Sequence, residues 1–386
     1  MTAPTLDIDA LLDDREVRIL VCCGSGGVGK TTTAASLAVR AAERGRDVVV
    51  LTIDPARRLA QSMGLTELDN TPRVVEGIDT SAGGSLEAMM LDMKRTFDEI
   101  VLDHSDSERA QQILDNPFYQ SLSSSMAGTQ EYMAMEKLGQ LRRNTAWDLI
   151  VVDTPPSRSA LDFLDAPKRL GSFLDGRVIR ILAAPAKAGG RGMFKMVTAG
   201  FNIVTNVITK VLGAQLLKDV SAFITALDTM FGGFRERADA TYKLLKNPET
   251  RFIVVAAPEP DALREASYFV ERLSEERMPL AGLVLNRVHR SAAESLTASR
   301  CIAAAEDLNG TESAGAEGDD DPSRIAAGLL RLHADRMNVI AREHRLTARF
   351  TGAHPGVAVG TVQALPGDVH DLDALRSIGT DLSVAG

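Results

Sequence analysis

The sequence has few of the residues that mark several classes of protein. Its 386 residues include only three cysteines, of which Cys22 and Cys23 are adjacent and Cys301 stands alone. This pattern excludes a disulfide framework and a C-x-x-C zinc site. The longest uncharged run within the apolar segment 193–234, residues 196–209, is too short to span a membrane. A formal net charge of −9 argues against a nucleic-acid partner.

The N-terminal segment also lacks the features of a secretory signal. Residues 1–14 (MTAPTLDIDALLDD) are acidic where a signal peptide is basic and then apolar. We therefore expect a cytoplasmic protein whose residues 1–16 form a polar N-terminal tail.

What the sequence does contain is the phosphate-loop pattern G-x-x-x-x-G-K-[ST]. It is formed by Gly24, Ser25, Gly26, Gly27, Val28, Gly29, Lys30, Thr31 and Thr32. The apolar run 17–23 before it predicts a buried strand, and the alanine-rich stretch 30–43 after it predicts a helix. Backbone N–H groups of such a loop surround a polyphosphate at the helix N-terminus. Lys30 is expected to reach the β- and γ-phosphates, and the Thr31 hydroxyl is expected to hold Mg²⁺.

Two acidic residues follow later apolar runs that we predict to be strands. Asp54 follows residues 47–53 (DVVVLTI), and Asp153 ends residues 147–153 (WDLIVVD). Ligands of open α/β sheets bind beyond the carboxyl ends of the strands, so both acids are expected near the phosphates. Asp153 has the placement of a carboxylate that holds Mg²⁺ directly or through water.

A residue for base recognition is predicted at the end of the strand 280–288. Asn286 could read the base through its amide, and a guanine site of the N-K-x-D type would place an acid three residues later. That position holds His289, which favours adenine.

The remaining segments give the domain organisation. We predict a long amphipathic helix over 85–115, a helix over about 128–143, and mostly helical structure over about 159–248. Residues 193–234 are unusually apolar, which by itself favours core helices over a groove for a partner helix. An acidic segment at about 306–323 is predicted to be a disordered insertion, followed by a helix over 326–345 and a strand over about 357–363. The predicted fold is a doubly wound, mostly parallel α/β sheet of the P-loop NTPase class, a single domain over 17–386 with a helical subdomain.

In this order the motifs resemble those of the arsenite-pump and guided-entry (tail-anchored protein targeting) ATPase family. The family's GKGGVGKTT is matched by GSGGVGKTT at 24–32, its DPA by 54–56, and its YDxIVxDTAPTGHTLR by residues 147–162. Its PGxxE, PE, VVN and PLLPEEVRG segments are similar to residues 127–131, 258–259, 285–286 and 363–371.

The resemblance implies roles for particular residues. It implies that Asp54 orients the attacking water, that Asp153 lies near Mg²⁺, and that Asn286 and the Pro366 loop surround adenine. It also implies that the apolar residues 193–234 belong to a client-binding subdomain at about 159–248. The catalytic residues are then Lys30, Asp54 and Asp153, and the metal residues are Thr31 and Asp153.

Two departures from the family pattern matter for catalysis. Ser25 replaces the signature lysine, which in the family reaches across a dimer to the partner's nucleotide. Arg158 and Ser159 replace Gly-His in the second switch. Because the chain has one P-loop, a paired active site requires a second chain, either a homodimer or a heterodimer with a homologous lysine-bearing chain.

The resulting hypothesis is an ATPase that uses ATP and Mg²⁺ to control binding of a hydrophobic protein client, with contact at the membrane periphery left open. One alternative is a weakly hydrolysing, nucleotide-binding regulatory subunit of a hetero-oligomeric ATPase. Another is a positioning ATPase of the chromosome-partition or septum-site kind.

Overall fold

A computed structural model describes residues 3–54, 58–116, 119–120, 130–155, 236–237, 239–310 and 322–384. Their centre is an eight-stranded sheet in the order β3-β4-β2-β5-β1-β6-β7-β8. The strands are β1 (Ile19–Gly24), β2 (Asp47–Thr52), β3 (Arg73–Val74), β4 (Ser85–Met90), β5 (Leu149–Asp153), β6 (Thr250–Ala256), β7 (Leu280–Val288) and β8 (Val359–Gln363). All neighbours are parallel except β3 and β4.

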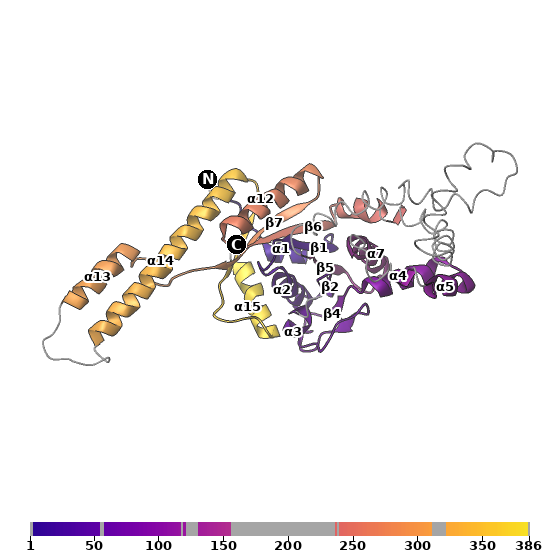
Figure 1. Cartoon of the computed structure of the whole chain (residues 1–386), viewed down its shortest axis with the longest axis horizontal. Coiled ribbons are helices and arrows are strands. Elements are labelled where there is room, and N and C mark those ends of the chain that lie inside the picture. The colour runs from indigo at the N-terminus through magenta and orange to yellow at the C-terminus, as the bar shows by residue number, and fades with distance from the viewer. Residues whose placement is uncertain are drawn as a thin grey trace, which may run out of the picture.

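The central strands are buried on both faces, as expected for a parallel sheet covered by helices. The helix α2 (Lys30–Glu43) packs with α15 (Leu372–Val384) on one side, while α12 (Pro260–Glu275) lies on the other (Figure 1). The predicted doubly wound α/β class is thus confirmed. Since β1 lies between β5 and β6, the loop after β1 is at the middle of the sheet edge.

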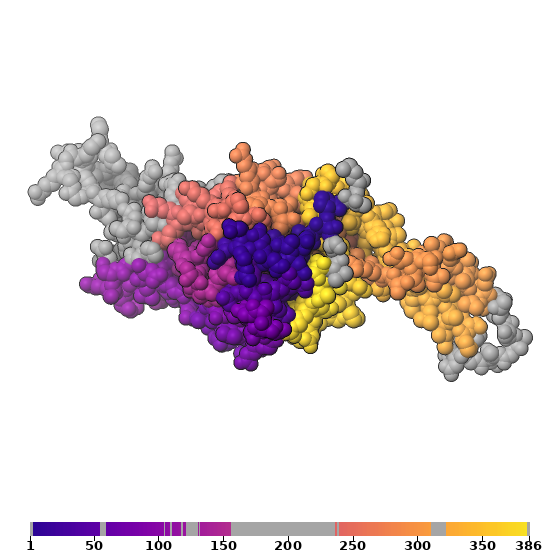
Figure 2. Space-filling model, turned by 180° about the vertical axis from the view of Figure 1, so that it is seen from behind, coloured from indigo at the N-terminus to yellow at the C-terminus, as the bar shows by residue number. Residues whose placement is uncertain are grey.

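The N-terminal segment is not the polar tail that its composition predicted. Residues 8–13 form helix α1 (Ile8–Asp13), and Leu6 and Ile8 are buried in the core. The fully buried Arg46 donates to the backbone carbonyls of Leu12, Asp14 and Val17, which ties this segment to the sheet. Figure 2 shows the N-terminal residues (indigo) lying on the body beside the C-terminal helix (yellow). The apolar residues of this segment are few and lie between acidic residues, so the sequence did not predict that the segment packs against the core.

The predicted helix over 85–115 is wrong in its first part. Residues 85–90 form β4, paired in parallel with β2, and helices α4 (Met93–His104) and α5 (Ser107–Leu114) follow. Leu86, Met89 and Met93 have helical spacing, but the first two are buried on β4, between β3 and β2. A short apolar run is compatible with both the helical and the strand periodicity. Pairing with β2 therefore determined that these residues form a strand.

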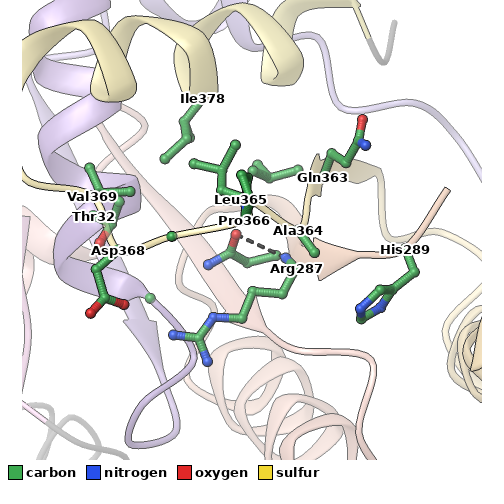
Figure 3. Close-up of a pocket in the computed structure, with 14 residues that line it drawn as sticks. Thr32, Arg287, His289, Gln363, Ala364, Leu365, Pro366, Asp368, Val369 and Ile378 are labelled. Carbon is green, nitrogen blue, oxygen red and sulfur yellow. Dashed lines mark hydrogen bonds between the residues drawn. The ribbon is translucent and has the colours of Figure 1, made fainter. Parts of the chain in front are cut away.

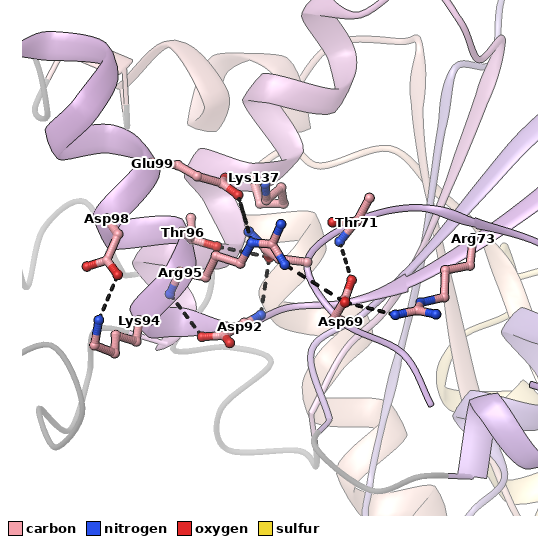
Figure 4. A network of polar contacts seen from close by, with 11 residues as sticks. Asp69, Thr71, Arg73, Asp92, Lys94, Arg95, Thr96, Asp98, Glu99 and Lys137 are labelled. Atoms are coloured by element: carbon pink, nitrogen blue, oxygen red, sulfur yellow. Dashed lines mark hydrogen bonds and ion pairs between the residues drawn. The ribbon is translucent and has the colours of Figure 1, made fainter. Parts of the chain in front are cut away.

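Polar contacts connect the loop before β3 to α4 and α7 (Gln130–Arg143) (Figure 4). Glu99 on α4 accepts hydrogen bonds from Asn70 Nδ2 at 3.0 Å and from the ammonium of Lys137 at 2.7 Å. Asn70 Oδ1 accepts from the Thr96 hydroxyl at 3.1 Å. Lys137 is nearly buried, so its ion pair with Glu99 holds α7 firmly against α4.

At the C-terminal side, α13 (Ala298–Gly310) and α14 (Pro322–Ala353) form a long helical hairpin that projects away from the sheet (Figures 1 and 2). The bounds predicted for the disordered insertion, about 306–323, are too wide, because α13 continues to Gly310 and α14 begins at Pro322. Residues 311–321 lie outside the described residues. Helix α15 was not predicted, yet it buries Leu375 and Leu382.

Exposed apolar side chains concentrate on this hairpin. Among the described residues, six of the ten large apolar side chains that are exposed lie on residues 296–339: Leu296, Ile302, Ile325, Leu329, Leu332 and Val339. The spacing of 325, 329 and 332 puts three of them on one face of α14. Exposed apolar residues that share one face of a helix are often found at protein association sites.

Most of the predicted helical subdomain at about 159–248 lies outside the described residues. Within it, residues 239–245 are helical. None of the described helices is both long and apolar enough to cross a membrane.

Candidate functional site

The P-loop joins β1 to α2 at the middle of the sheet edge and is held in a glycine-dependent conformation. Gly27 and Gly29 have φ of 77° and 94°, which favour glycine over residues with a side chain. A Cβ at Gly24 would lie 2.1 Å from the carbonyl oxygen of Val255 on β6. Ser25 follows Gly24 with its side chain partly exposed, at the position of the family's signature lysine. The glycines therefore let the loop lie close to its neighbours.

Lys30 begins α2 and extends back along the loop. Its ammonium donates to the carbonyl oxygen of Ser25 at 2.8 Å, and the residue is 7% exposed. Burial lowers the pKa of Lys30, while the nearby carboxylates of Asp153 and Asp54 act in the opposite direction. The ammonium of Lys30 lies against the phosphate loop. Phosphate oxygens could therefore replace the Ser25 carbonyl as the acceptor of its hydrogen bond.

Asp153, at the end of β5, lies directly behind the P-loop threonine. One carboxylate oxygen, Oδ2, accepts from the hydroxyls of Thr31 at 2.8 Å and Thr52 at 2.9 Å. The other, Oδ1, is buried and has no hydrogen-bond partner among the described residues. Burial raises the pKa of Asp153 to about 6, against the lowering effect of the two hydroxyls.

This hydroxyl–carboxylate pair fits a magnesium ion. Mg²⁺ prefers oxygen ligands and is usually held by one or two protein groups together with substrate phosphates. The hydroxyl of Thr31 is a group of that kind, and so is Oδ1 of Asp153, which has no partner among the described residues. No cluster of three His, Cys, Asp or Glu suited to a metal occurs in the described part of the chain. In nucleotide sites, phosphate oxygens commonly supply further ligands to Mg²⁺.

Asp54 lies two residues beyond β2, close enough to Lys30 for its carboxylate to act on the pKa of the ammonium. Its backbone N–H donates to the Thr52 hydroxyl at 3.3 Å. At the start of α7, the side chain of Gln130 donates to the Ile53 carbonyl at 2.8 Å. The segment before Asp54 is thus fixed to α7, while residues 55 and 56, the rest of the family-like DPA motif at 54–56, lie outside the described residues. Thr52 was missed from the sequence because a strand threonine carries no motif of its own.

A cavity of about 600 Å³ lies next to the P-loop (Figure 3). Its walls include Gly29, Thr32, Asn286 and the loop 362–369 that contains Pro366. The structure thus brings all the residues predicted for the base together around one hollow.

The amide of Asn286 is engaged with the protein. Nδ2 donates to the carbonyl of Val28 at 2.8 Å, and Oδ1 accepts from the backbone N–H of Arg287 at 2.9 Å. A Cβ at Gly29 would lie 2.1 Å from Nδ2. Asn286 therefore connects the P-loop to the end of β7, and direct reading of the base by its amide stays a prediction.

His289, where a guanine site would have an acid, is held by an acid from a distant helix. Glu343 on α14 accepts from the His289 backbone N–H at 2.9 Å and contacts its ring Nδ1 at 2.6 Å. Both carboxylate oxygens are thus used within the protein. No sequence signal links positions 54 residues apart, so this pair was not predicted.

The sequence was compared with known protein families and with individual known proteins. Residues 17–307 match the family model described as anion-transporting ATPase. The chain is 26% identical over 285 residues to the ATPase get3 of Schizosaccharomyces japonicus, covering 73% of this chain and 78% of the relative. It is 25% identical to the ATPase get3 of Schizosaccharomyces pombe over 73% of this chain and 76% of the relative. It is 27% identical to the ATPase ARSA2 of Chlamydomonas reinhardtii over 75% of this chain and 72% of the relative.

The family match covers more than half of the chain and contains the P-loop, both acids and Asn286. The chain therefore belongs to the anion-transporting ATPase family and is a P-loop ATPase.

Proposed function

We propose that this ATPase binds Mg-ATP and couples its hydrolysis to capture and release of a hydrophobic protein client. The observation that carries the nucleotide part is the contact between Thr31 and Asp153 behind the P-loop, with Asp153 Oδ1 left unpartnered among the described residues in a buried position. When bound, Mg²⁺ would neutralise charge on the phosphates. Lys30 would bind phosphate oxygens, and Asp54 would orient the attacking water.

Adenine is the proposed base. A guanine site of the N-K-x-D type would carry an acid at the position of His289, and the neighbouring carboxylate of Glu343 already binds His289 through both oxygens. His289 itself offers no carboxylate to the N1 and N2 donors of a guanine base. Titration with Mg-ATP and Mg-GTP tests this, with tighter binding of ATP expected; equal or tighter GTP binding would refute it.

The client part of the proposal depends on residues outside the described ones. Its support is the apolar composition of 193–234, the resemblance to guided-entry ATPases, and relatives named ATPase get3. Helices α4 and α7, which precede the predicted subdomain along the chain, are tied to each other by the Glu99–Lys137 pair, and α7 is tied to the segment before Asp54 by Gln130. These contacts connect the segment before Asp54 to α7 and, through α7, to α4.

The test uses the full chain with an apolar transmembrane-segment peptide as the probe. Binding is measured without nucleotide, with Mg-ADP and with a non-hydrolysable ATP analogue, and we expect it to depend on the nucleotide. Lys30→Ala should abolish that dependence together with ATP turnover. Val207→Asp and Phe223→Asp should give folded proteins that bind ATP but lose the peptide. If both variants unfold, or if peptide binding ignores the nucleotide, the client function is wrong.

Ser25 supports a second, paired form of the same function. Serine carries no charge, so the site lacks the cation that the family's lysine provides across the dimer, and such a charge is worth about 10³–10⁵ in rate in comparable NTPases. We therefore include in the proposal a second subunit, a homologous chain that bears the lysine. The exposed apolar face of α14 is a described surface that supports association.

Turnover measured alone, with Ser25→Lys, and with a lysine-bearing homologue distinguishes the paired form from the alternatives. Slow turnover that either addition raises supports pairing. Fast turnover by the protein alone, unchanged by Ser25→Lys, rejects it. Turnover that stays low in every combination leaves the regulatory nucleotide-binding subunit as the function.

A further inference from the structure

The end of β7 is held in an unusual backbone conformation. Arg287 has φ of 61°, a left-handed conformation that side-chain-bearing residues seldom adopt. The pairing of β7 with β8 shifts register between Leu285 and Val288, so a bulge is centred on Arg287. Such bulges redirect a side chain, and residues in strained conformations cluster at functional sites.

Neighbouring contacts hold this conformation. Asn286 Oδ1 accepts from the backbone N–H of Arg287, while its Nδ2 donates to the P-loop carbonyl of Val28. Beyond the bulge, the Ala364 N–H donates to the Val288 carbonyl at 2.9 Å. Contacts on both sides thus hold Arg287 in its left-handed conformation. The same contacts connect the end of β7 to the P-loop and to the loop that follows β8.

The consequence of the bulge is that Arg287 projects into the cavity beside the P-loop. Figure 3 shows its side chain extending from the end of β7 across the cavity toward the side where Asp368 lies. The residue is exposed, and its guanidinium makes no hydrogen bond or ion pair with any of the described residues. Two other arginines nearby are engaged: Arg290 donates to the Thr361 hydroxyl, and Arg336 donates to the carbonyl of Arg290.

The chemistry of the cavity indicates what Arg287 contacts. A planar guanidinium packs well on aromatic faces, because it is delocalised and weakly hydrated. The P-loop N–H groups and Lys30 already account for phosphate recognition. The cavity beyond Gly29 and Thr32 continues to the 362–369 loop, which is the part of the site left for the base.

We propose that the guanidinium of Arg287 packs against the purine base of the bound nucleotide. This inference rests on the proposed binding of ATP and adds a specific base contact to it. It also gives the strained bulge a function, since an extended residue at this position would point its side chain elsewhere.

The experiment is calorimetric titration of the full chain with Mg-ADP and with a non-hydrolysable ATP analogue. Arg287→Ala should weaken both nucleotides by the same factor, about 5- to 30-fold, which is the range of a cation–aromatic contact that is partly desolvated. Arg287→Lys should remain nearly as weak, because a compact, hydrated ammonium does not replace a planar group.

Two controls separate the contact from folding and from bulk charge. Arg287→Gly keeps the bulge without strain, since glycine adopts positive φ readily, and should melt at a temperature no lower than wild type while losing affinity as the alanine variant does. Arg264→Ala removes an exposed arginine on α12 and should leave both affinities unchanged.

Three results would each contradict the proposed base contact. They are unchanged affinity in Arg287→Ala, full recovery of affinity in Arg287→Lys, and a loss of affinity confined to the ATP analogue. The last two would instead indicate a phosphate contact. If the wild-type protein binds neither nucleotide, the proposed function fails first, and the two failures are thus distinguishable.

Discussion

The buried carboxyl of Asp153 makes folding stability depend on pH in a way that can be calculated. Its pKa rises from the ordinary aspartate value of 3.8 to about 6 in the folded protein, chiefly because of burial. The folded state therefore holds this proton more tightly than the unfolded chain. The contribution of Asp153 to stability is fully present below about pH 4, is lost as the pH rises through about 6, and stays lost above that.

The magnitude follows from the size of the shift. A pKa shift of this size corresponds to a total contribution of about 3 kcal/mol to the free energy of unfolding. About 2 kcal/mol of this contribution is lost between about pH 4.5 and 7.5. Asp153→Asn has no such titration, and its amide oxygen can still accept from Thr31 and Thr52. The free energy of unfolding of wild type minus that of Asp153→Asn should therefore fall by about 2 kcal/mol over this range.

Urea unfolding without nucleotide or magnesium, at several pH values, measures this difference. Other titrating groups cancel in the subtraction, and Asp103→Asn on the exposed side of α4 controls for the substitution itself. With Mg-ADP present, the wild type should regain stability near pH 7.5, because a bound cation favours the ionised carboxylate. A difference that is flat with pH, or that rises, would refute the reasoning.

Three further predictions concern the site and the hairpin. Asp54→Asn should keep ATP affinity within a few-fold while lowering kcat by about 10²-fold or more, because a water-orienting group acts in the transition state; a collapse of affinity with kcat preserved would mean a structural role. Gly29→Ala should lower both stability, by about 1–3 kcal/mol, and nucleotide affinity, because φ is 94° and its Cβ would lie 2.1 Å from Asn286 Nδ2; chemical unfolding and calorimetry measure the two, and a neutral result would show that the P-loop can move away from β7. Leu332→Asp, at a residue 67% exposed, should leave the melting temperature unchanged but reduce association with a second subunit in light scattering; association unaffected by this change would place the dimer contact elsewhere.

The sequence by itself determined those parts of this protein whose chemistry is local. A phosphate loop needs only glycines, a lysine and a threonine between a strand and a helix, and all of these are contiguous at 24–32. Parallel strands place their carboxyl ends at one edge, so Asp54 and Asp153 could be assigned to the same edge from their positions after apolar runs.

Tertiary structure decided what depends on contacts between distant segments. Strand β4 forms where helical spacing predicted a helix, because pairing with β2 buries Leu86 and Met89. The N-terminal segment packs because buried Arg46 binds its carbonyls, and no local pattern announces such a contact.

The cavity next to the P-loop also contains some residues that the sequence predicted and others that only the folded structure revealed. Asn286 and Pro366 could be named from the sequence, but the bulge that turns Arg287 into the cavity comes from the pairing of β7 with β8. The carboxylate that holds His289 comes from Glu343, 54 residues later on α14. Strand register and long-range packing are set by the whole fold, which is why these residues could be found only once the chain was seen folded.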